Sequence, residues 1–404
     1  MSSYPKVTFA LPEAYLGALA GLPWDRPLEE WGAAGVKSFA VRRGNGRHPL
    51  VFPRVGNLRL VVKELSVETA RHEVEVYREL LERGIRTLTP IGWVEREEEP
   101  IAVATPVGIQ MERDAYGLSV TQLERRVIPN SRIYPFPLGA GNRERITLAV
   151  ADLFVDLHSN GVYWGDASPD NLLLQFVQMR IPLIGRRSRL RALLADAETV
   201  ELYPALSPGL RRADLDHFIE AVAWVNEDLR LAGLDPVRLA GPADRAALLA
   251  AYQRRLAVVT EAKEFRAATG LEPSRVLGDV SHPSYWNTLR KHIEEHRWYL
   301  AESSGAAVEL PAAAADWYEK VFLPVCALFR EAGAIDQLPG KTAAELYVDV
   351  MTHKYFLSRS LGRDVGMVVA TRDYLERFSD EAARSPLWRK VLERLGEILR
   401  FGAD

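Results

Sequence analysis

The sequence predicts an α+β protein with a small five-stranded lobe, a helical lobe and an all-α C-terminal domain. Short apolar runs separated by turn residues make up residues 36–112, and helical spacing dominates after about residue 117. The 404 residues are 48% hydrophobic, which is enough for a large core in two or three domains. We expect a lead segment at 1–35, a strand-rich lobe at 36–112, a helical lobe at 113–265 and a helical domain at 266–404.

Composition and charge exclude several classes of protein. The formal net charge is −3, so no broad basic surface is expected to attract nucleic acid or an anionic membrane. Cys326 is the one cysteine, which excludes intramolecular disulfides and Cys-rich zinc sites and fits a reducing compartment. We find neither a signal-peptide pattern nor a run of roughly 18 apolar residues. We therefore expect a soluble cytoplasmic protein without a transmembrane segment.

Five strand-like segments and one helix predict the small lobe. "VKSFAVRR", "PLVFPRV" and "LRLVVKEL" fall within residues 36–65 and are separated by turn residues. "SVETARHEVEVYRELLERG" then predicts a helix capped by Ser66 and followed by Gly84. "LTPIGWV" and "IAVATPV" resemble a hairpin that turns over the acidic "EREEEP". The pattern therefore indicates a small sheet with one helix inserted after its third strand.

A polar loop in the helical lobe has the composition of a phosphoryl-transfer site. It lies between a helix ending before Gly161 and the strand "LLLQFV". Phosphoryl transfer needs a carboxylate that orients and deprotonates the acceptor hydroxyl, oxygen ligands for Mg²⁺, and a lysine on the phosphates. In "GDASPDN", Asp166 and Asn171 have the spacing of the Asp and Asn in the kinase motif H-R-D-L-x-x-x-N. We expect Asp166 to accept the proton and Asn171 to bind the metal.

The other parts of such a site follow in the order that kinases require. Asp196 ends the strand in "LLADAETV", where the D-F-G aspartate binds Mg²⁺. Lys63 in "LVVKEL" has the position of the V-A-I-K lysine, and Glu73 on the next helix could pair with it. Gly44 and Gly46 in "GNG" form a reduced glycine-rich loop or a simple hairpin turn. Each feature is common alone, but the ordered set predicts a bilobal protein-kinase-like fold that binds ATP and Mg²⁺.

Several segments resemble a known family. "GVYWGDASPDNLLL" and "LLADAETVELYP" resemble bacterial proteins of unknown function whose core is similar to lipopolysaccharide (Kdo) kinases. "PLEEW", "VVKEL", "ARHEVEVYREL" and "HKYFLSRSLGRDVG" extend the likeness from about residue 20 to residue 378. The resemblance implies a kinase-like core, ATP and magnesium as ligands, and an associated helical C-terminal region. It implies no particular substrate.

The sequence departs from the protein-kinase pattern at three places. Trp164 and Gly165 replace the His-Arg of the motif, as in small-molecule and lipopolysaccharide-type kinases, which argues against a regulated protein kinase. "DAE" keeps Asp196 but lacks the phenylalanine, so no activation-loop switch is expected. Glu73 follows Lys63 by only ten residues, which makes their pairing the least secure assignment.

These observations predict an ATP- and Mg²⁺-dependent phosphotransferase acting on a hydroxyl acceptor, with a small molecule, sugar or lipid-linked glycan favoured over a protein. An insert between the two strands that follow the loop carries Arg180, Arg186, Arg187, Arg189 and Arg191. These arginines could form a basic flap for an anionic acceptor. The simpler interpretation, a long hairpin with solvated or ion-paired arginines, is favoured.

The C-terminal third contains a weak internal repeat. "HRWYLAESSG" begins at His296 and "HKYFLSRSLG" at His353, which is an offset of 57 residues. Each copy is followed by another helical segment. We expect a duplicated helical scaffold and favour it over a second active site.

Two other functions stay open. "HIEEH" fits the inverted zinc-protease pattern H-x-x-E-H, with His292 and His296 as ligands and Glu295 as base. Such five-residue patterns arise by chance, and the repeat has Asp349 at the position of His292. A kinase-like fold could also bind ATP without catalysis and hold a protein partner through its C-terminal helices. This second alternative is disfavoured because the sequence retains the four expected site residues, namely Lys63, Asp166, Asn171 and Asp196.

Overall fold

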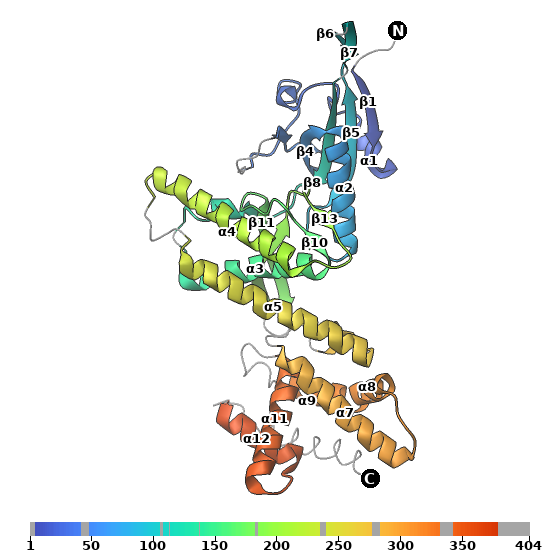
Figure 1. The fold of residues 1–404 in the computed structure, drawn as a ribbon, viewed down its shortest axis with the longest axis vertical. Helices are drawn as coiled ribbons and strands as arrows, with labels where there is room; N and C mark the ends of the chain where they lie inside the picture. The colour runs from blue at the N-terminus through green and yellow to red at the C-terminus, as the bar shows by residue number, and fades with distance from the viewer. Residues whose placement is uncertain are drawn as a thin grey trace. The chain divides into compact units, whose positions relative to one another are not determined.

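A computed structural model gives the fold of the chain, which is drawn as a ribbon in Figure 1. It describes residues 5–41, 48–105, 108–112, 114–136, 138–181, 185–234, 240–276, 283–331 and 342–378. The chain divides into two compact units, residues 1–252 and residues 253–404. The first unit holds an antiparallel sheet and a helical lobe, and the second is helical, so the α+β class is confirmed.

An antiparallel sheet forms the small lobe of the first unit. Its strands follow the order β1-β5-β8-β4-β2, and β3 pairs with β4 beside this path. The strands are β1 (Lys6–Ala10), β2 (Leu50–Val51), β3 (Arg54–Val55), β4 (Leu58–Ser66), β5 (Pro90–Glu97) and β8 (Ala115–Gln122). Helix α2 (Val67–Glu82) contacts β4, β5 and β8, which are the central strands of the sheet. The predicted sheet with one helix inserted after the lysine-bearing strand is therefore present.

Parts of the predicted strand pattern were wrong. β5 does not form a hairpin with β6 (Ile101–Thr105), because β5 pairs with β8 and β6 pairs with β7 (Gly108–Glu112). β8 lies where the helical pattern was expected to begin. Leu118, Ser119, Val120 and Thr121 of β8 alternate between apolar and polar residues, as in a strand, and the expected helical pattern overlooked this. In the described part of "VKSFAVRR", an isolated bridge from Ser38 to Pro53 replaces a regular strand.

The junction between β4 and α2 follows from local sequence. Ser66 ends β4 and caps α2, because its Oγ accepts a hydrogen bond from the Thr69 amide at 3.1 Å. Gly84 follows the helix at φ +74°. A side chain at Gly117 of β8 would meet the Ser66 carbonyl at 2.5 Å, so this glycine lets the helix lie directly against the strand. The predicted helix and its cap are confirmed.

The lead segment covers the small lobe. β1 pairs antiparallel with β5, so that the backbone of β5 is hydrogen-bonded on both sides and β1 forms the edge of the sheet. Helix α1 (Glu13–Leu19) and the 3₁₀ turn Leu28–Glu30 follow. Trp24 and Trp31 are buried, meet edge to face at 5.1 Å, and join the core formed with sheet residues such as Val62 and Leu118.

The helical lobe is built around α3 (Ala140–Ser159) and α4 (Pro208–Leu231). β11 (Leu172–Ile181) and β12 (Gly185–Leu194) form a long antiparallel hairpin, and β9 (Val127–Pro129) pairs with β11. β10 (Val162–Tyr163) pairs with β13 (Glu201–Leu202). Most residues in the second half of α3 are buried, including Leu153 and Leu157, and the helix ends at Ser159, before Gly161 as predicted. The polar loop 164–171 lies between β10 and β11.

The second unit is helical throughout its described part. It contains α6 (Pro273–Val276), α7 (Ser284–Ser304), α8 (Leu310–Trp317), the π-helical turn Tyr318–Phe322, α9 (Leu323–Glu331), α11 (Ala343–Leu361) and α12 (Gly366–Phe378), together with the end of α5 (Pro242–Thr269). Its core gathers Trp317, Phe322 and Tyr347, whose rings meet at 5.0 to 5.9 Å. This unit therefore has a core of its own.

The 57-residue offset relates equivalent contacts in the second unit. His296 Nε2 meets Asp316 Oδ2 at 2.9 Å, and His353 Nε2 meets Asp373 Oδ2 at 2.6 Å. A lysine in the first copy and an arginine in the second, Lys320 and Arg377, also bind these aspartates. Each first helix ends at a glycine with a left-handed conformation, φ 67° in one copy and 63° in the other. Each His–Asp bond thus joins the two helices of one copy.

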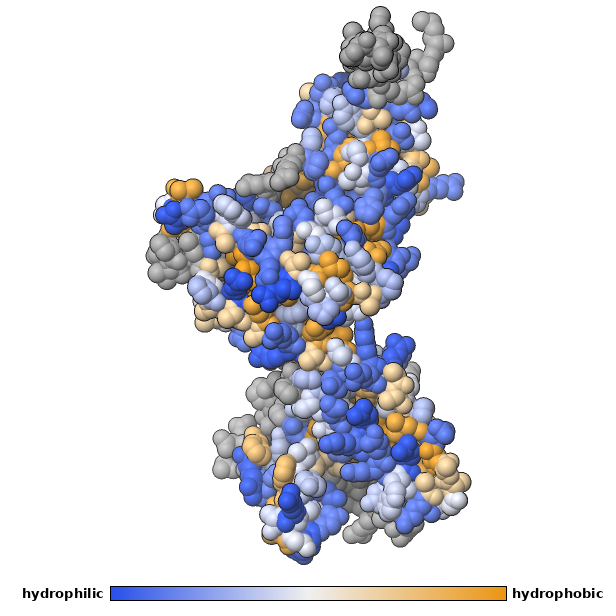
Figure 2. All heavy atoms as spheres, viewed as in Figure 1, coloured by the Kyte–Doolittle hydropathy of each residue, from blue (hydrophilic) through white to orange (hydrophobic). Residues whose placement is uncertain are grey.

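Hydrophobic residues on the surface are dispersed. On the face drawn in Figure 2, they form separate patches among hydrophilic residues. Of the helices that the structure describes, none has the length and apolar character needed to cross a membrane.

Candidate active site

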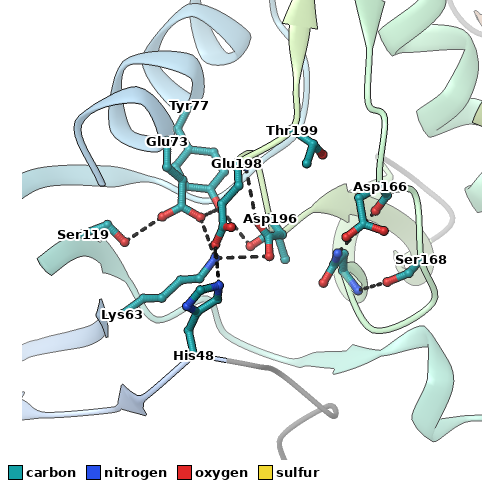
Figure 3. Close-up of polar contacts among 12 residues, drawn as sticks. His48, Lys63, Glu73, Tyr77, Ser119, Asp166, Ser168, Asp196, Glu198 and Thr199 are labelled. Atoms are coloured by element: carbon teal, nitrogen blue, oxygen red, sulfur yellow. Dashed lines mark hydrogen bonds and ion pairs between the residues drawn. The ribbon is translucent and has the colours of Figure 1, made fainter. Parts of the chain in front are cut away.

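Lys63 on β4 is surrounded by carboxylates. Its Nζ lies 3.1 Å from Glu73 Oε1 and 3.1 Å from Asp196 Oδ2, and it also pairs with Glu198 (Figure 3). Only 14% of the Lys63 side chain is exposed. Burial lowers the pKa of Lys63, but Glu73 and Asp196 outweigh burial and raise it above its usual value. The ammonium group therefore stays charged.

Glu73 is fixed by three donors. Besides Lys63, the hydroxyl of Ser119 on β8 donates to Oε2 at 2.6 Å, and the Tyr77 hydroxyl shares its one proton between Oε1 at 3.2 Å and the Ala195 carbonyl at 2.8 Å. The spacing of ten residues had made the Lys63–Glu73 pair the least secure assignment, yet the structure forms it. Because α2 begins directly after β4, a short spacing brings the second turn of the helix back over the lysine.

Asp196 and Glu198 come from the segment "DAE" after β12. The Ala195 amide donates to the Asn171 carbonyl at 2.9 Å, and the indole Nε1 of Trp164 donates to the Asp196 carbonyl at 3.0 Å. Among the described residues, Glu73, Asp196 and Glu198 are the group whose ligand atoms, all within 4.8 Å of one another, could hold a metal ion. Burial raises the pKa of Asp196 to about 6, although Lys63 opposes it. Sequence reasoning missed Glu198.

The loop holds Asp166 and Asn171 on the other side of the site. The Asn171 Nδ2 donates to the Asp166 carbonyl at 3.3 Å, and the Asn171 amide donates to Ser168 Oγ at 3.3 Å. The Asp166 side chain is 57% exposed, and His217 Nε2 on α4 lies 3.2 Å from its Oδ1 (Figure 3 labels Asp166 and Ser168). One oxygen of Asp166 is thus oriented by α4 while its carboxylate faces solvent.

A buried aspartate on α4 supports the backbone of this loop. Asp214 accepts hydrogen bonds from the amides of Trp164 at 2.8 Å and Gly165 at 2.9 Å. His158 Nε2 lies 3.2 Å from the same carboxylate, and its Nδ1 lies 2.8 Å from the Tyr252 hydroxyl. Burial lowers the pKa of His158, so the imidazole is neutral and bridges the two groups. Asp214 lies 50 residues after Trp164 and 56 residues after His158 in the chain, and no local motif revealed these contacts.

Gly165 is required by the loop geometry. Its φ is +81°, and a Cβ there would lie 2.9 Å from the Thr199 carbonyl. Thr199 in turn donates its hydroxyl to the Trp164 carbonyl at 2.8 Å. A glycine therefore stands where the kinase motif has arginine because this backbone excludes a side chain.

A cavity of about 480 Å³ opens between the small lobe and the loop. Lys63, Glu73, Asn171 and Asp196 line its polar part. Its apolar lining includes Leu50, Phe52, Val61, Leu88, Leu123, Ile128 and Leu173. The volume is within the range of small-molecule and cofactor sites. Gly44 and Gly46 lie outside the residues that the structure describes.

The "HIEEH" segment does not assemble a metal site in the described part of the chain. His296 is engaged by Asp316, and His292 packs edge to face on the Tyr347 ring at 5.7 Å. Burial lowers the pKa of His292 to about 4. Glu295 is exposed on α7, and these side chains are absent from the group that could hold an ion.

The arginine insert is part of the β11–β12 hairpin. The strands pair in continuous register, including Arg180 opposite Arg186. The Arg189 guanidinium lies 4.0 Å from the Asp152 carboxylate. The side chains of Arg180, Arg186 and Arg187 lie outside the described set. A role for these arginines in binding an acceptor stays a prediction.

The chain is similar in part to one sequence family and to several solved structures. A family model described as "Domain of unknown function (DUF4032)" matches residues 312–378, less than half of the chain. A search of curated proteins finds no match. Among solved structures, WaaP in complex with acyl carrier protein is 17% identical, with a TM-score of 0.37 over 66% of this chain and 93% of WaaP.

Two further solved structures are similar to this chain. The Rio2 kinase from Chaetomium thermophilum, in its ADP/Mg²⁺-phosphoaspartate complex, is 15% identical, with a TM-score of 0.31 over 61% of this chain and 72% of Rio2. Aminoglycoside-3'-phosphotransferase of type VIII is 16% identical, with a TM-score of 0.31 over 60% of this chain and 92% of that enzyme.

The fold and the arrangement of the site define a protein-kinase-like core. Its parts are the lysine on a central strand, the glutamate on the following helix, the Asp–Asn loop and the aspartate after the next strand pair. A helical C-terminal region follows this core.

Proposed function

We propose that the chain is an ATP- and Mg²⁺-dependent phosphotransferase that acts on a hydroxyl-bearing acceptor. The observation that carries this proposal is the Lys63–Glu73 pair at 3.1 Å beside Asp196, in a cavity that Asn171 also lines. This is the set of groups that holds a nucleoside triphosphate and its metal in kinases. The apolar part of the same cavity suits the flat base of the nucleotide.

Asp196, Glu198 and Asn171 supply the ligands for Mg²⁺ in this proposal. Carboxylate and amide oxygens suit that ion. The raised pKa of Asp196 supports a cation there, because burial leaves its negative charge incompletely compensated by Lys63. When bound, the ion would neutralise charge on the phosphates. Lys63 would then exchange part of its contact with the carboxylates for contact with the phosphates.

Asp166 would orient the acceptor hydroxyl and take its proton. The acceptor oxygen forms a bond to the γ-phosphorus as the bond to the β–γ bridging oxygen breaks, and ADP leaves with that electron pair. Asp166 is suited to this role because it is exposed toward incoming acceptor and one of its oxygens is oriented by His217. Lys63 would balance charge on the departing nucleotide.

The sequences of the Asp166 loop and of the "DAE" segment favour one class of phosphoryl acceptor. Trp164 and Gly165 replace the His-Arg pair, and "DAE" lacks the phenylalanine of a regulated activation segment. We therefore favour a small molecule, sugar or lipid-linked glycan over a protein. An anionic acceptor would suit the β11–β12 hairpin, because its five arginines lie between Asn171 and Asp196 in the chain.

Thermal unfolding with and without ATP and Mg²⁺ tests the nucleotide site. Ligand at about 100 times its dissociation constant should stabilise the protein by about 2.7 kcal/mol, which shifts the midpoint by a few degrees. The shift should require Mg²⁺ and vanish in Asp196→Asn. Asp25→Asn, an exposed carboxyl outside the site, serves as the matched control. No shift of the wild-type protein at millimolar ATP would contradict the proposal.

Formation of ADP distinguishes an enzyme from an ATP-binding scaffold. A panel of hydroxyl acceptors should include one that increases ADP release and gains the phosphoryl group, with both signals lost in Asp166→Asn. ATP binding without acceptor-dependent ADP release across the panel would favour the scaffold that binds a partner through the helical region.

A further inference from the structure

A second cavity lies in the helical lobe of the first unit. Its volume is about 330 Å³, and its lining residues are distinct from those of the nucleotide cavity. It is enclosed by the segment before α3, by α3 and α4, and by the first turns of α5, helices that are labelled in Figure 1. The proposed phosphotransferase reaction makes no use of it.

The interior of this cavity is apolar. Its apolar lining comprises Ile133, Leu138, Ile146, Val150, Phe218, Ile219, Val222, Ala223, Pro242 and Leu248. Val150 and Phe218 are each only 3% exposed, so the cavity reaches into the packed core. Well-packed cores contain few voids larger than a water molecule.

The charged lining residues of the cavity lie close together. Arg143 binds Asp244 through Nη1, at 3.2 Å to Oδ1 and 3.0 Å to Oδ2. Arg245 is half exposed and lies 3.7 Å from Asp216. Asp216 lies outside the lining and also binds Arg212 Nε at 2.7 Å, so three guanidinium groups share two carboxylates here. This group carries a net positive charge.

We propose that this cavity binds a single-chain amphiphile with an apolar body and one anionic head group, as in a medium-chain carboxylate. The apolar body would lie against Val150, Phe218 and Val222, and the head group would lie near Arg245. The cavity has about twice the volume of an apolar cavity that accepts benzene, so roughly ten carbon atoms would fill it. The net positive charge beside Arg245 selects an anion over a neutral or cationic head.

Calorimetric titration of the full chain with decanoate, below its micelle-forming concentration, tests the proposal. We expect saturable binding to one site. Decanol should bind several-fold more weakly, and decyltrimethylammonium should not bind. Absence of saturable decanoate binding would overturn the proposal, and equal binding of decanol would overturn the anionic head group.

Variants locate the binding site. Val222→Phe fills the cavity and should weaken decanoate binding at least tenfold. Glu220→Phe places the same bulk at an exposed position of α4 outside the lining and should leave binding unchanged. Val61→Phe narrows the nucleotide cavity and should also leave it unchanged. Weaker binding by Val61→Phe with normal binding by Val222→Phe would place decanoate in the nucleotide cavity and overturn the proposal.

Two further measurements keep the outcome clear. If Val222→Phe fails to give a cooperative thermal transition, Ala223→Leu at the adjacent lining position takes its place. Arg245→Gln should reduce the preference for decanoate over decanol by about threefold, as expected for a half-exposed ion pair. An unchanged preference would remove Arg245 from the site. None of these readouts depends on phosphotransferase activity.

Discussion

The two units use the same kinds of polar residue in opposite ways. In the first unit, Lys63 is surrounded by three carboxylates, and burial raises the pKa of Asp196 to about 6. In the second, Asp316 and Asp373 each have a histidine and a second cation as partners. Burial acts to raise the pKa of both aspartates, but these hydrogen bonds outweigh it and lower the pKa.

This difference separates carboxylates that support the fold from carboxylates available to a ligand. A lowered pKa means that the folded protein favours the charged form, so the ion pair contributes to stability. A raised pKa means that the charged form is incompletely compensated, which is common where a protein binds a cation or performs chemistry. This comparison indicates that the His–Asp pairs hold helices together. Asp196, although it contacts Lys63, is a carboxylate that a further cation would stabilise.

The largest effect should come from Asp166→Asn. Loss of the proposed base should lower ATP-dependent phosphoryl transfer by about 10²- to 10⁴-fold, because positioned proton transfer contributes about that much. ATP-induced thermal stabilisation should persist. Steady-state kinetics and thermal unfolding measure the two effects, and full activity of the variant would remove Asp166 from the mechanism.

Gly165→Ala should break the support of the loop. A side chain at φ +81° that approaches the Thr199 carbonyl should cost about 1–3 kcal/mol. Gly141→Ala in α3 is the matched control, since a Cβ there has open space. Chemical denaturation should show the loss in Gly165→Ala alone, and equal stability of the two variants would contradict the strain argument.

Asp196→Asn should stabilise the ligand-free protein while abolishing Mg²⁺-dependent binding. Above pH 6 the folded protein holds a charge that its surroundings disfavour, and the neutral amide relieves this penalty by about 1–2 kcal/mol. The penalty is absent below the unfolded pKa and grows as pH rises toward 6. Denaturation at pH 7.5 without nucleotide measures the gain. A lower stability at that pH would show that the Lys63 contact outweighs burial.

The stability of the second unit should fall in mild acid because of His292. Burial lowers its folded pKa to about 4, so the unfolded chain binds a proton first as pH falls below 6.5. Stability is therefore lost between pH 6.5 and 4, by about 1 kcal/mol over the first unit of pH. His292→Phe should flatten this dependence in denaturation curves. An unchanged slope would assign the acid sensitivity to other groups.

The smallest effects should come from the repeated His–Asp pairs. Asp316→Asn and Asp373→Asn should each lower stability by about 0.5–1.5 kcal/mol, the usual net value of one hydrogen bond. The double variant should show the sum, because each pair lies within its own copy of the repeat. Equilibrium denaturation gives all three values, and a large departure from additivity would show that the two copies are coupled.

The parts of the candidate site that the sequence revealed are those with a local signature. Asp166 and Asn171 share one loop, Lys63 follows the apolar run of β4, and Asp196 comes two residues after β12. Glu198, Asp214 and His217 lack such a signature, since an acidic residue after a strand or on a helix is common. β8 differs from these residues, because the alternation of Leu118, Ser119, Val120 and Thr121 was a local strand signal that the predicted helical pattern overlooked.

The sequence by itself determined the helix α2 with its cap, the end of α3 before Gly161, and the order of the residues that meet at the site. Periodicity, caps and turn residues act over a few positions, so they can be read directly. Only the tertiary structure decided which distant groups meet. Tyr77 donates to the Ala195 carbonyl 118 residues away, and Ser119 binds Glu73 across 46 residues. Such contacts depend on strand order and helix packing, which set the distance between groups independently of their separation along the chain.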